Sequence, residues 1–308
     1  MSLRVVFMGS PSFAVPTLKA LHRRFQVVGV FTQPDKPKGR GRKPVPTEVK
    51  AAALSMGLPV KEPKTLSSQD TVDVLKEWNG DVAVVVAYGK ILPRTILELP
   101  RMGCVNLHAS LLPRHRGAAP ISSAILAGDA VTGVTTIAMD EGMDTGGILL
   151  QHAIPIDPDD TAGTLHDKIM EPGADLVVET LKGLATGTLQ PVPQDHSRAT
   201  YSRLLSKRDG RIQWEEDAEY LSRLVRAVNP WPGAFLELDG ETLKVWKASP
   251  EKGDGVPGRI EAVRDNGIVV GTGHGFLVLE ELQAPGKRRL HAREFAMGRK
   301  IEVGKKFA

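Results

Sequence analysis

The 308-residue sequence contains a single cysteine, Cys104, and no long hydrophobic run. One thiol cannot form an internal disulfide, which favours a protein of a reducing compartment. The longest apolar run, Val82 to Ala87, is far shorter than the ~20 residues that a membrane-spanning helix requires. The N-terminus lacks a basic stretch followed by a long apolar stretch, so we expect no signal peptide. These absences predict a cytoplasmic protein with no membrane partner.

Basic residues are unevenly distributed along a chain whose formal net charge is only +4. They gather at Lys36–Lys43, at Lys287–Arg289 and in the last ten residues. A solvated surface would explain any one of these clusters. Separated basic clusters also fit a polyanionic partner, because contacts to phosphates release counterions. Charge alone leaves both interpretations open.

Strands and helices alternate through the first two-thirds of the sequence. Strands are expected at Leu3–Met8, Val27–Thr32, Val82–Ala87, Gly103–His108, Val134–Met139 and Ile148–Ile156. Helices are expected at Ser12–Leu21, with Ser12 as N-cap, and at Val45–Met56, Val72–Trp78, Ala119–Leu126 and Leu165–Leu184. The continuous apolar strand at 82–87 is typical of a sheet covered on both faces. The alternation predicts an α/β fold with a doubly wound sheet.

The character of the sequence changes near Gly187. The segment to Arg198 contains two prolines and few apolar residues, which is typical of a linker. A helix is then expected at Asp217–Val228, followed by short strands at Ala234–Leu238, Thr242–Trp246, Gly258–Val263, Gly267–Val270 and Gly275–Leu282. Short strands separated by Gly- and Asp-rich turns fit a small β-barrel of the oligonucleotide-binding (OB) type. We expect an α/β domain over residues 1–188, a linker over 189–206 and a barrel domain over 207–308.

Two polar residues stand at the end of the strand expected at 103–108. Strand alternation places Asn106 and His108 on one face, at the carboxyl end where open α/β sheets bind ligands. An amide can donate to an oxyanion and an imidazole can move a proton near neutral pH, so the pair suits acyl transfer. Two polar residues that only satisfy a loop would give the same pattern.

Further candidates surround this strand. The acidic, glycine-rich segment Asp140–Gly147 is either a solvated hairpin or the source of an acid that orients His108. Cys104 shares the strand parity of His108. Two interpretations of its thiol therefore stay open: a nucleophile, or a part of the hydrophobic core. The basic loop 33–44 follows a strand on the ligand-binding rim, where an anionic substrate could be contacted.

Patterns for a nucleotide cofactor and for a metal are missing. The turn Gly9–Ser12 follows the first strand but lacks G-x-G-x-x-G, and Pro11 removes a backbone donor. The eight histidines show neither i, i+4 pairing nor the cysteine companions of a zinc site. We expect neither a nicotinamide cofactor nor a metal.

Several motifs resemble those of formyltransferases that use 10-formyltetrahydrofolate. The shared segments are Asn106–Pro113, Arg116–Pro120 and Gly142–Gly146. Two further pairs of segments narrow the resemblance to the methionyl-tRNA formyltransferase family: Val30–Lys36 with Gly39–Arg42, and Asn229–Ala234 with Lys244–Ala248. The resemblance runs from the first strand to the tail. It implies a Rossmann-like N-terminal domain, an OB-like C-terminal barrel, and 10-formyltetrahydrofolate and methionyl-initiator tRNA as substrates.

The resemblance also implies roles for particular side chains. The family's catalytic residues match Asn106, His108 and Asp144. Its folate-contacting run matches Ser110, Leu111, Leu112 and Pro113. Charge and resemblance together assign tRNA contacts to Lys38, Arg40, Arg42, Lys43, Lys287, Arg288 and Arg289. His115 stands where the family usually has an aromatic residue, and Ser12 where an acid is common.

In this scheme Asn106 binds the formyl oxyanion, His108 assists proton transfer and Asp144 orients His108. Two other functions compete with it. One is formyl transfer to a small amine such as glycinamide ribonucleotide or an amino sugar-nucleotide, which would not need the basic clusters. The other is a non-catalytic RNA-binding module, which would have no need of all three matched residues. A monomer is the default expectation.

Overall fold

The structure, a computed structural model, describes residues 3–38 and 43–307, which belong to two compact units. The N-terminal unit comprises Met1–Pro120, Val131–Pro155 and His166–Ser202. The C-terminal unit comprises Ile121–Ala130, Ile156–Leu165 and Arg203–Ala308. Among the described residues, no helix is both long enough and apolar enough to cross a bilayer.

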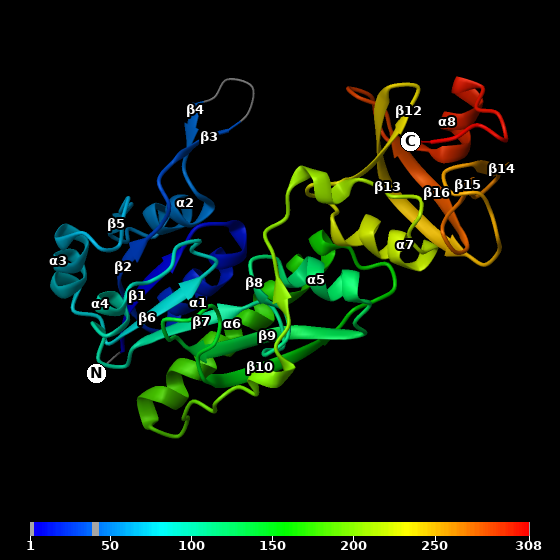
Figure 1. The fold of residues 1–308 in the computed structure, drawn as a ribbon. Coiled ribbons are helices and arrows are strands. Elements are labelled where there is room, and N and C mark those ends of the chain that lie inside the picture. The colour runs from blue at the N-terminus through cyan, green and yellow to red at the C-terminus, as the bar shows by residue number, and fades with distance from the viewer. Residues whose placement is uncertain (1–2, 39–42, 308) are drawn as a thin grey trace. The chain divides into compact units, whose positions relative to one another are not determined.

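A seven-stranded sheet forms the frame of the N-terminal unit (Figure 1), in the order β10-β9-β7-β6-β1-β2-β5. Its strands are β1 (Arg4–Gly9), β2 (Gln26–Phe31), β5 (Val60–Lys61), β6 (Val82–Val86), β7 (Cys104–His108), β9 (Val131–Ala138) and β10 (Ile148–Pro155). The five strands from β7 to β5 are parallel. β9 runs antiparallel to both β7 and β10. The alternation along the chain therefore predicts the α/β class, and the structure adds an antiparallel strand.

The centre of the sheet is buried on both faces. Every residue of β6 is buried, which explains why this strand reads as a continuous apolar run. One face packs Ala83 and Val85 with Cys104 against helix α3 (Gln69–Trp78) and the short helix α4 (Arg94–Leu97). Further helices within residues 3–188 are α1 (Val15–Arg24), α2 (Glu48–Ser55), α5 (Pro120–Ala127) and α6 (Ala162–Thr186).

Four of the expected helix starts lie three residues from the observed ones, and two of these are α3, which begins at Gln69 instead of Val72, and α6, which begins at Ala162 instead of Leu165. Ser12 does not cap the first helix: it begins a 3-10 turn, and α1 starts at Val15 with Ala14 as its N-cap. The second helix starts at Glu48, because the Thr47 side chain accepts a hydrogen bond from the Lys50 backbone N–H. The residues before it form an unexpected hairpin of β3 (Lys36–Lys38) and β4 (Lys43–Val45).

The C-terminal unit is built on an antiparallel sheet, coloured yellow to red in Figure 1. Its strands are β12 (Ala234–Leu238), β13 (Glu241–Glu251), β14 (Ile260–Arg264), β15 (Gly267–Gly271), β16 (Phe276–Gln283) and β17 (Leu290–His291). Helix α7 (Ala218–Ala227) buries Leu221 and Val225 in the same core as Leu279 of β16. The sequence predicts α7 and all strands but β17, and it does not predict helix α8 (Ala292–Arg299).

Candidate active site

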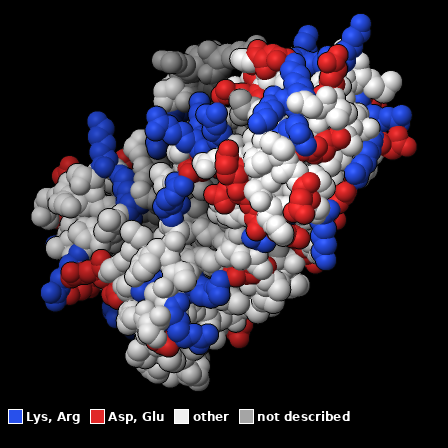
Figure 2. All heavy atoms as spheres, turned by 45° about the vertical axis from the view of Figure 1, so that its right-hand side comes forward, with Lys and Arg blue, Asp and Glu red and all other residues white. Residues whose placement is uncertain are grey.

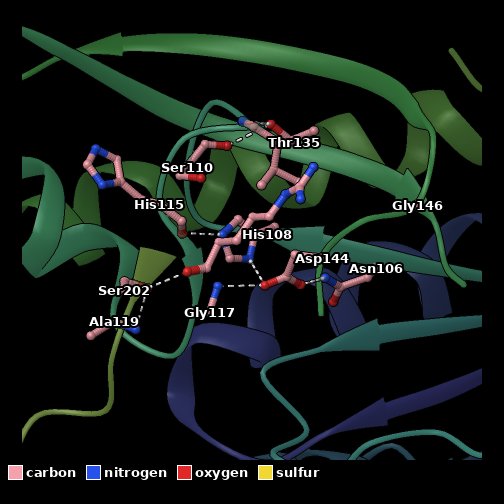
Figure 3. Close-up of polar contacts among 12 residues, drawn as sticks. Asn106, His108, Ser110, His115, Gly117, Ala119, Thr135, Asp144, Gly146 and Ser202 are labelled. Atoms are coloured by element: carbon pink, nitrogen blue, oxygen red, sulfur yellow. Dashed lines mark hydrogen bonds and ion pairs between the residues drawn. The ribbon is translucent and has the colours of Figure 1, made fainter. Parts of the chain in front are cut away.

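The end of β7 brings together the three residues that the sequence singles out (Figure 3). Asn106 and His108 leave the strand on the same face, and both contact the carboxylate of Asp144. Asn106 Nδ2 donates to Oδ1 at 3.4 Å, and His108 Nδ1 lies 3.5 Å from Oδ2. Asp144 is distant in sequence and reaches the strand because the loop after the antiparallel strand β9 returns to it.

The imidazole of His108 is fixed from both sides. Its Nε2 lies 3.0 Å from the carbonyl oxygen of His115. A carbonyl only accepts, so Nε2 carries the proton and donates it. The opposite nitrogen, Nδ1, faces Asp144. With only 6% of the His108 residue surface exposed, the ring has little room to turn. The arrangement leaves Nδ1 and the carboxylate as the polar atoms available for proton exchange.

Asp144 is held in a conformation that a non-glycine residue seldom adopts. Its φ is 53°, in the left-handed region, where an L-residue loses about 1–2 kcal/mol. The backbone N–H of Gly117 donates to Asp144 Oδ2 at 2.8 Å. Gln194 Nε2 donates to the backbone oxygens of Asp144 and Gly146 at 2.8 and 2.7 Å. These contacts compensate for the strain and aim the carboxylate at His108.

Gly117 and Gly146 leave no room for a larger residue. A Cβ on Gly117 would lie 2.3 Å from the Ser202 carbonyl oxygen, and φ there is 109°. A Cβ on Gly146 would lie 1.9 Å from the Ala138 carbonyl oxygen. Both glycines therefore allow a close approach of backbone that shapes the pocket around Asp144.

The segment matched to the folate-contacting run packs against β9. Ser110 and Leu112 both bond to Thr135: its hydroxyl donates to the Ser110 carbonyl at 2.6 Å and accepts from the Leu112 N–H at 3.1 Å. Gln151 Nε2 donates to the Leu112 carbonyl at 2.9 Å. Ser110 and Leu112 are buried, while Leu111 and Pro113 are partly exposed. Their contact with folate stays a prediction.

A cavity of about 170 Å³ opens beside Asp144. It is lined by Lys90, Ile91, Leu92, Ile137, Met139, Asp140, Glu141, Gly142, Met143 and Asp144. The Lys90 ammonium donates to the carbonyl oxygens of Pro63 and Lys64, and burial lowers the pKa of Lys90. Ser110 to Pro113 are not among the lining residues. The lining residues 90–92, Ile137 and Met139 carried no catalytic pattern in the sequence and were missed, whereas Asp140–Asp144 belong to the acidic segment that the sequence singles out.

Cys104 lies in the core, although it shares the parity of Asn106 and His108. Its thiol contacts the carbonyl oxygens of Ile96 and Leu97 at 3.8 Å, and burial raises the pKa of Cys104 to about 12. A neutral, buried thiol is a poor nucleophile. Among the described residues, no group of three or more His, Cys, Asp or Glu side chains is placed to hold a metal ion.

The basic residues assigned to tRNA fall in three places. Lys38 ends β3 and Lys43 begins β4, whereas Arg40 and Arg42 lie outside the described residues. Lys287, Arg288 and Arg289 are exposed in the turn between β16 and β17. On the face that Figure 2 shows, Lys and Arg side chains are interspersed with Asp and Glu.

An aromatic residue organises the basic turn of the C-terminal unit. The Arg289 guanidinium lies 3.4 Å from the centre of the Trp246 ring, and the Lys244 ammonium lies 5.5 Å from it. The indole N–H donates to Gln283 Oε1 at 2.8 Å, and Gln283 donates in turn to the Lys287 carbonyl. Trp246 therefore fixes Arg289 in the turn.

Comparison with known proteins identifies the family of this chain. Residues 3–181 match the family model described as formyl transferase, and residues 204–300 match that of the formyl transferase C-terminal domain. The chain is 48% identical over 303 residues to the methionyl-tRNA formyltransferase of Geobacter metallireducens, which covers 98% of this chain and 97% of the relative. The chain belongs to the methionyl-tRNA formyltransferase family.

A second relative supports the family, and one more distant structure has the same fold. The methionyl-tRNA formyltransferase of Trichlorobacter lovleyi is 46% identical, covering 98% of this chain and 96% of the relative. The N-formyltransferase of Helicobacter canadensis, solved with folinic acid and dTDP-3-aminofucose, has a TM-score of 0.66 at 17% identity over 90% of this chain and 98% of its own. That structure shares the fold of the formyltransferase family.

Proposed function

We propose that this formyltransferase moves the formyl group of 10-formyltetrahydrofolate to the α-amine of methionine esterified to initiator tRNA. The observation that carries the proposal is the 48% identity over nearly the whole chain to a curated methionyl-tRNA formyltransferase. The contacts of Asn106, His108 and Asp144 supply the chemistry that such a reaction needs. Translation initiation takes place in the cytoplasm, so the proposed function locates the protein there.

The reaction forms one C–N bond and breaks another. The amine nitrogen attacks the formyl carbon, a tetrahedral intermediate forms, and its collapse expels N10 of the folate. One proton leaves the amine and one proton reaches N10, so the transfer needs no oxidant or reductant. Aligning the two substrates and stabilising the intermediate are therefore the enzyme's main tasks.

Asn106 is suited to the oxyanion. One of its two Nδ2 protons points to Asp144 Oδ1 at 3.4 Å, and the other remains for the formyl oxygen. Placing a donor where negative charge develops lowers the barrier more than it strengthens ground-state binding. Asp144, bonded to the Gly117 N–H, holds His108 and takes the proton that leaves the amine.

The cavity beside Asp144 is the proposed place for the pterin end of the folate. Its wall offers the apolar side chains of Leu92, Ile137 and Met139, and these suit the faces of a flat heterocycle. Backbone groups of the Asp140–Asp144 loop can form hydrogen bonds with the polar edge of the heterocycle. Ser110 to Pro113 remain candidates for the part of the cofactor that leaves the cavity.

Contacts with tRNA are proposed for both ends of the chain. Lys38, Arg40, Arg42 and Lys43 would reach the acceptor end, and Lys287, Arg288 and Arg289 would contact the phosphate backbone. The proposal also includes an OB-like barrel as the architecture of the C-terminal unit and a monomeric state. Its domain limits are 1–188 for the α/β domain, 189–206 for the linker and 207–308 for the barrel domain.

An acceptor panel tests the proposed function. The purified protein is given 10-formyltetrahydrofolate with methionyl-initiator tRNA, glycinamide ribonucleotide or a dTDP-amino sugar, and formylated product is measured by mass spectrometry. Formyl-methionyl-tRNA as the main product supports the proposal. Preferential formylation of either small amine, or tRNA binding with no transfer to any acceptor, would overturn it.

A further inference from the structure

The segment after helix α6, which the sequence predicts to be a linker, is hydrogen-bonded to the active-site loop at residues 116–119. β11 (Tyr201–Ser202) pairs in parallel with β8 (Arg116–Gly117). The Ser202 hydroxyl donates to the Arg116 carbonyl at 3.0 Å and accepts from the Ala119 N–H at 3.2 Å. The active-site loop is thus held by residues far along the chain.

Within this segment, Gln194 is the residue that reaches Asp144. It is buried, and both ends of its amide are used. Its Nε2 donates to the carbonyl oxygens of Asp144 and Gly146, and its Oε1 accepts from Arg116 Nε and Nη2 at 3.2 and 2.7 Å. A reversed amide would turn each of these contacts into a repulsion, so the partners define its orientation.

Arg116 is a buried cation whose side chain hydrogen-bonds, within the described part of the chain, to the neutral acceptors Gln194 and His196. Only 1% of its surface is exposed, and Nη2 bonds to His196 Nδ1 at 3.1 Å as well as to Gln194. A glutamate at 194 would compensate the charge of Arg116 better than an amide does. It could not donate to Asp144 and Gly146, which explains why an amide is needed here.

We propose that Gln194, anchored by the buried guanidinium of Arg116, is a positioning residue that fixes the Asp144 carboxylate for formyl transfer. Neither residue touches the reacting atoms. Gln194 secures the two backbone oxygens around the left-handed turn at Asp144, and Gly117, next to Arg116, binds the Asp144 side chain. The inference rests on the proposed function and extends it to a residue outside the catalytic motifs.

The test compares Gln194→Glu with Gln194→Met and with the matched control Gln190→Glu. Gln190 lies in the same segment but is exposed. Gln194→Glu keeps an acceptor for Arg116, and it replaces the two donors with a carboxylate oxygen that repels the carbonyl oxygens of Asp144 and Gly146. We expect kcat to fall by about 10- to 100-fold in both Gln194 variants, because small displacements of a catalytic group have effects of this size. KM for both substrates should change little, and Gln190→Glu should match the wild type.

A double-mutant cycle separates positioning from a general structural effect. In an Asp144→Asn background, Gln194→Glu should cause almost no further loss in single-turnover rate, because its target has already been removed. The ¹⁵N signal of His108 Nδ1, assigned with His108→Gln, should shift in Gln194→Glu. Full activity of both Gln194 variants would overturn the inference. So would a Gln194→Glu variant that lowers the single-turnover rate by the same factor in the Asp144→Asn background as in the wild type. A wild-type protein that formylates no tRNA would instead refute the proposed function.

Discussion

Asn106 donates one amide proton to Asp144 over 3.4 Å, which is long for a hydrogen bond to a carboxylate. The contact therefore orients the Asn106 amide and leaves its second Nδ2 proton for another acceptor. The nitrogen can shift toward a developing oxyanion without losing a strong partner.

Asn106→Ala should lower the single-turnover rate of formyl transfer by roughly 10²–10³, as expected for the loss of one oxyanion donor. Binding of 10-formyltetrahydrofolate, measured by quenching of tryptophan fluorescence, should remain close to that of the wild type. Asn266→Ala in the exposed turn before β15 is the control and should leave both quantities unchanged. Transfer by Asn106→Ala at the wild-type rate would remove Asn106 from the mechanism.

Gly117→Ala should cost both stability and activity. The added Cβ would meet the Ser202 carbonyl oxygen at 2.3 Å and would sit at a φ of 109°. Gly187→Ala is the control, because φ is +70° there but nothing lies within 4 Å of the added atom. The control should lose about 1–2 kcal/mol of unfolding free energy from the backbone alone. Denaturant titration should show a larger loss for Gly117→Ala, and equal losses would show that the close approach has no energetic role.

Cys104 should not take part in the reaction. Its pKa is raised to about 12 by burial, so the thiol stays protonated throughout the neutral range. Iodoacetamide at pH 8 should modify Cys104 only after denaturation, which intact-mass measurement detects. Cys104→Ala should keep a wild-type kcat. Rapid alkylation of the native protein together with loss of activity would restore the thiol as a candidate nucleophile.

Trp246→Leu and Arg289→Ala should weaken tRNA binding in the same way. Both changes release the guanidinium that lies 3.4 Å from the indole ring. Each should reduce the slope of log affinity against log salt by about one, since one phosphate contact is lost. Lys252→Ala, an exposed lysine elsewhere in the C-terminal unit, provides the comparison. A slope that stays the same in both variants would exclude this turn from the RNA-binding surface.

Asp81 should make stability depend on pH in the acid range. The Arg4 backbone N–H, and then the Arg101 guanidinium, hold the pKa of Asp81 below its usual value. A carboxyl with a lowered pKa stabilises the fold above its unfolded pKa, about 3.9, and loses that contribution as the pH falls through the folded value. Asp81→Asn should lose about 1–2 kcal/mol at pH 7. The difference from the wild type should shrink as the pH falls below the unfolded pKa, and Asp175→Asn on the exposed side of α6 serves as the comparison.

The sequence predicts where a residue lies when its position follows from strand alternation or from a continuous apolar run. Asn106 and His108 lie on one face because strand alternation requires it, and the buried strand β6 is readable as an apolar run. Asp144 is different. It lies in the loop between β9 and β10, so it approaches β7 only because β9 pairs with that strand. Its place in the site came from the resemblance to a family, and the contacts with Asn106 and His108 now give it a geometric basis.

Gln194 lies beyond what local patterns can predict. It occurs between Pro193 and Asp195 in a polar, proline-containing stretch, which favours an exposed connection. Only the tertiary structure shows that its amide is buried between Arg116 and the Asp144 turn. The start of α2 at Glu48 shows a different limit: Val45 pairs with Lys36 in the β3–β4 hairpin, so the helix begins only after the cap at Thr47.

The fastening of β8 by β11 has a consequence for the nascent chain. Asn106, His108 and Asp144 are synthesised early, but the residues that hold their loop, ending at Ser202, are made about 60 residues after Asp144. The site therefore cannot close until the ribosome has released that stretch. A fragment cut behind the α6 helix would carry Asn106, His108 and Asp144 and would lack the contacts of Gln194 and Ser202 with their loops.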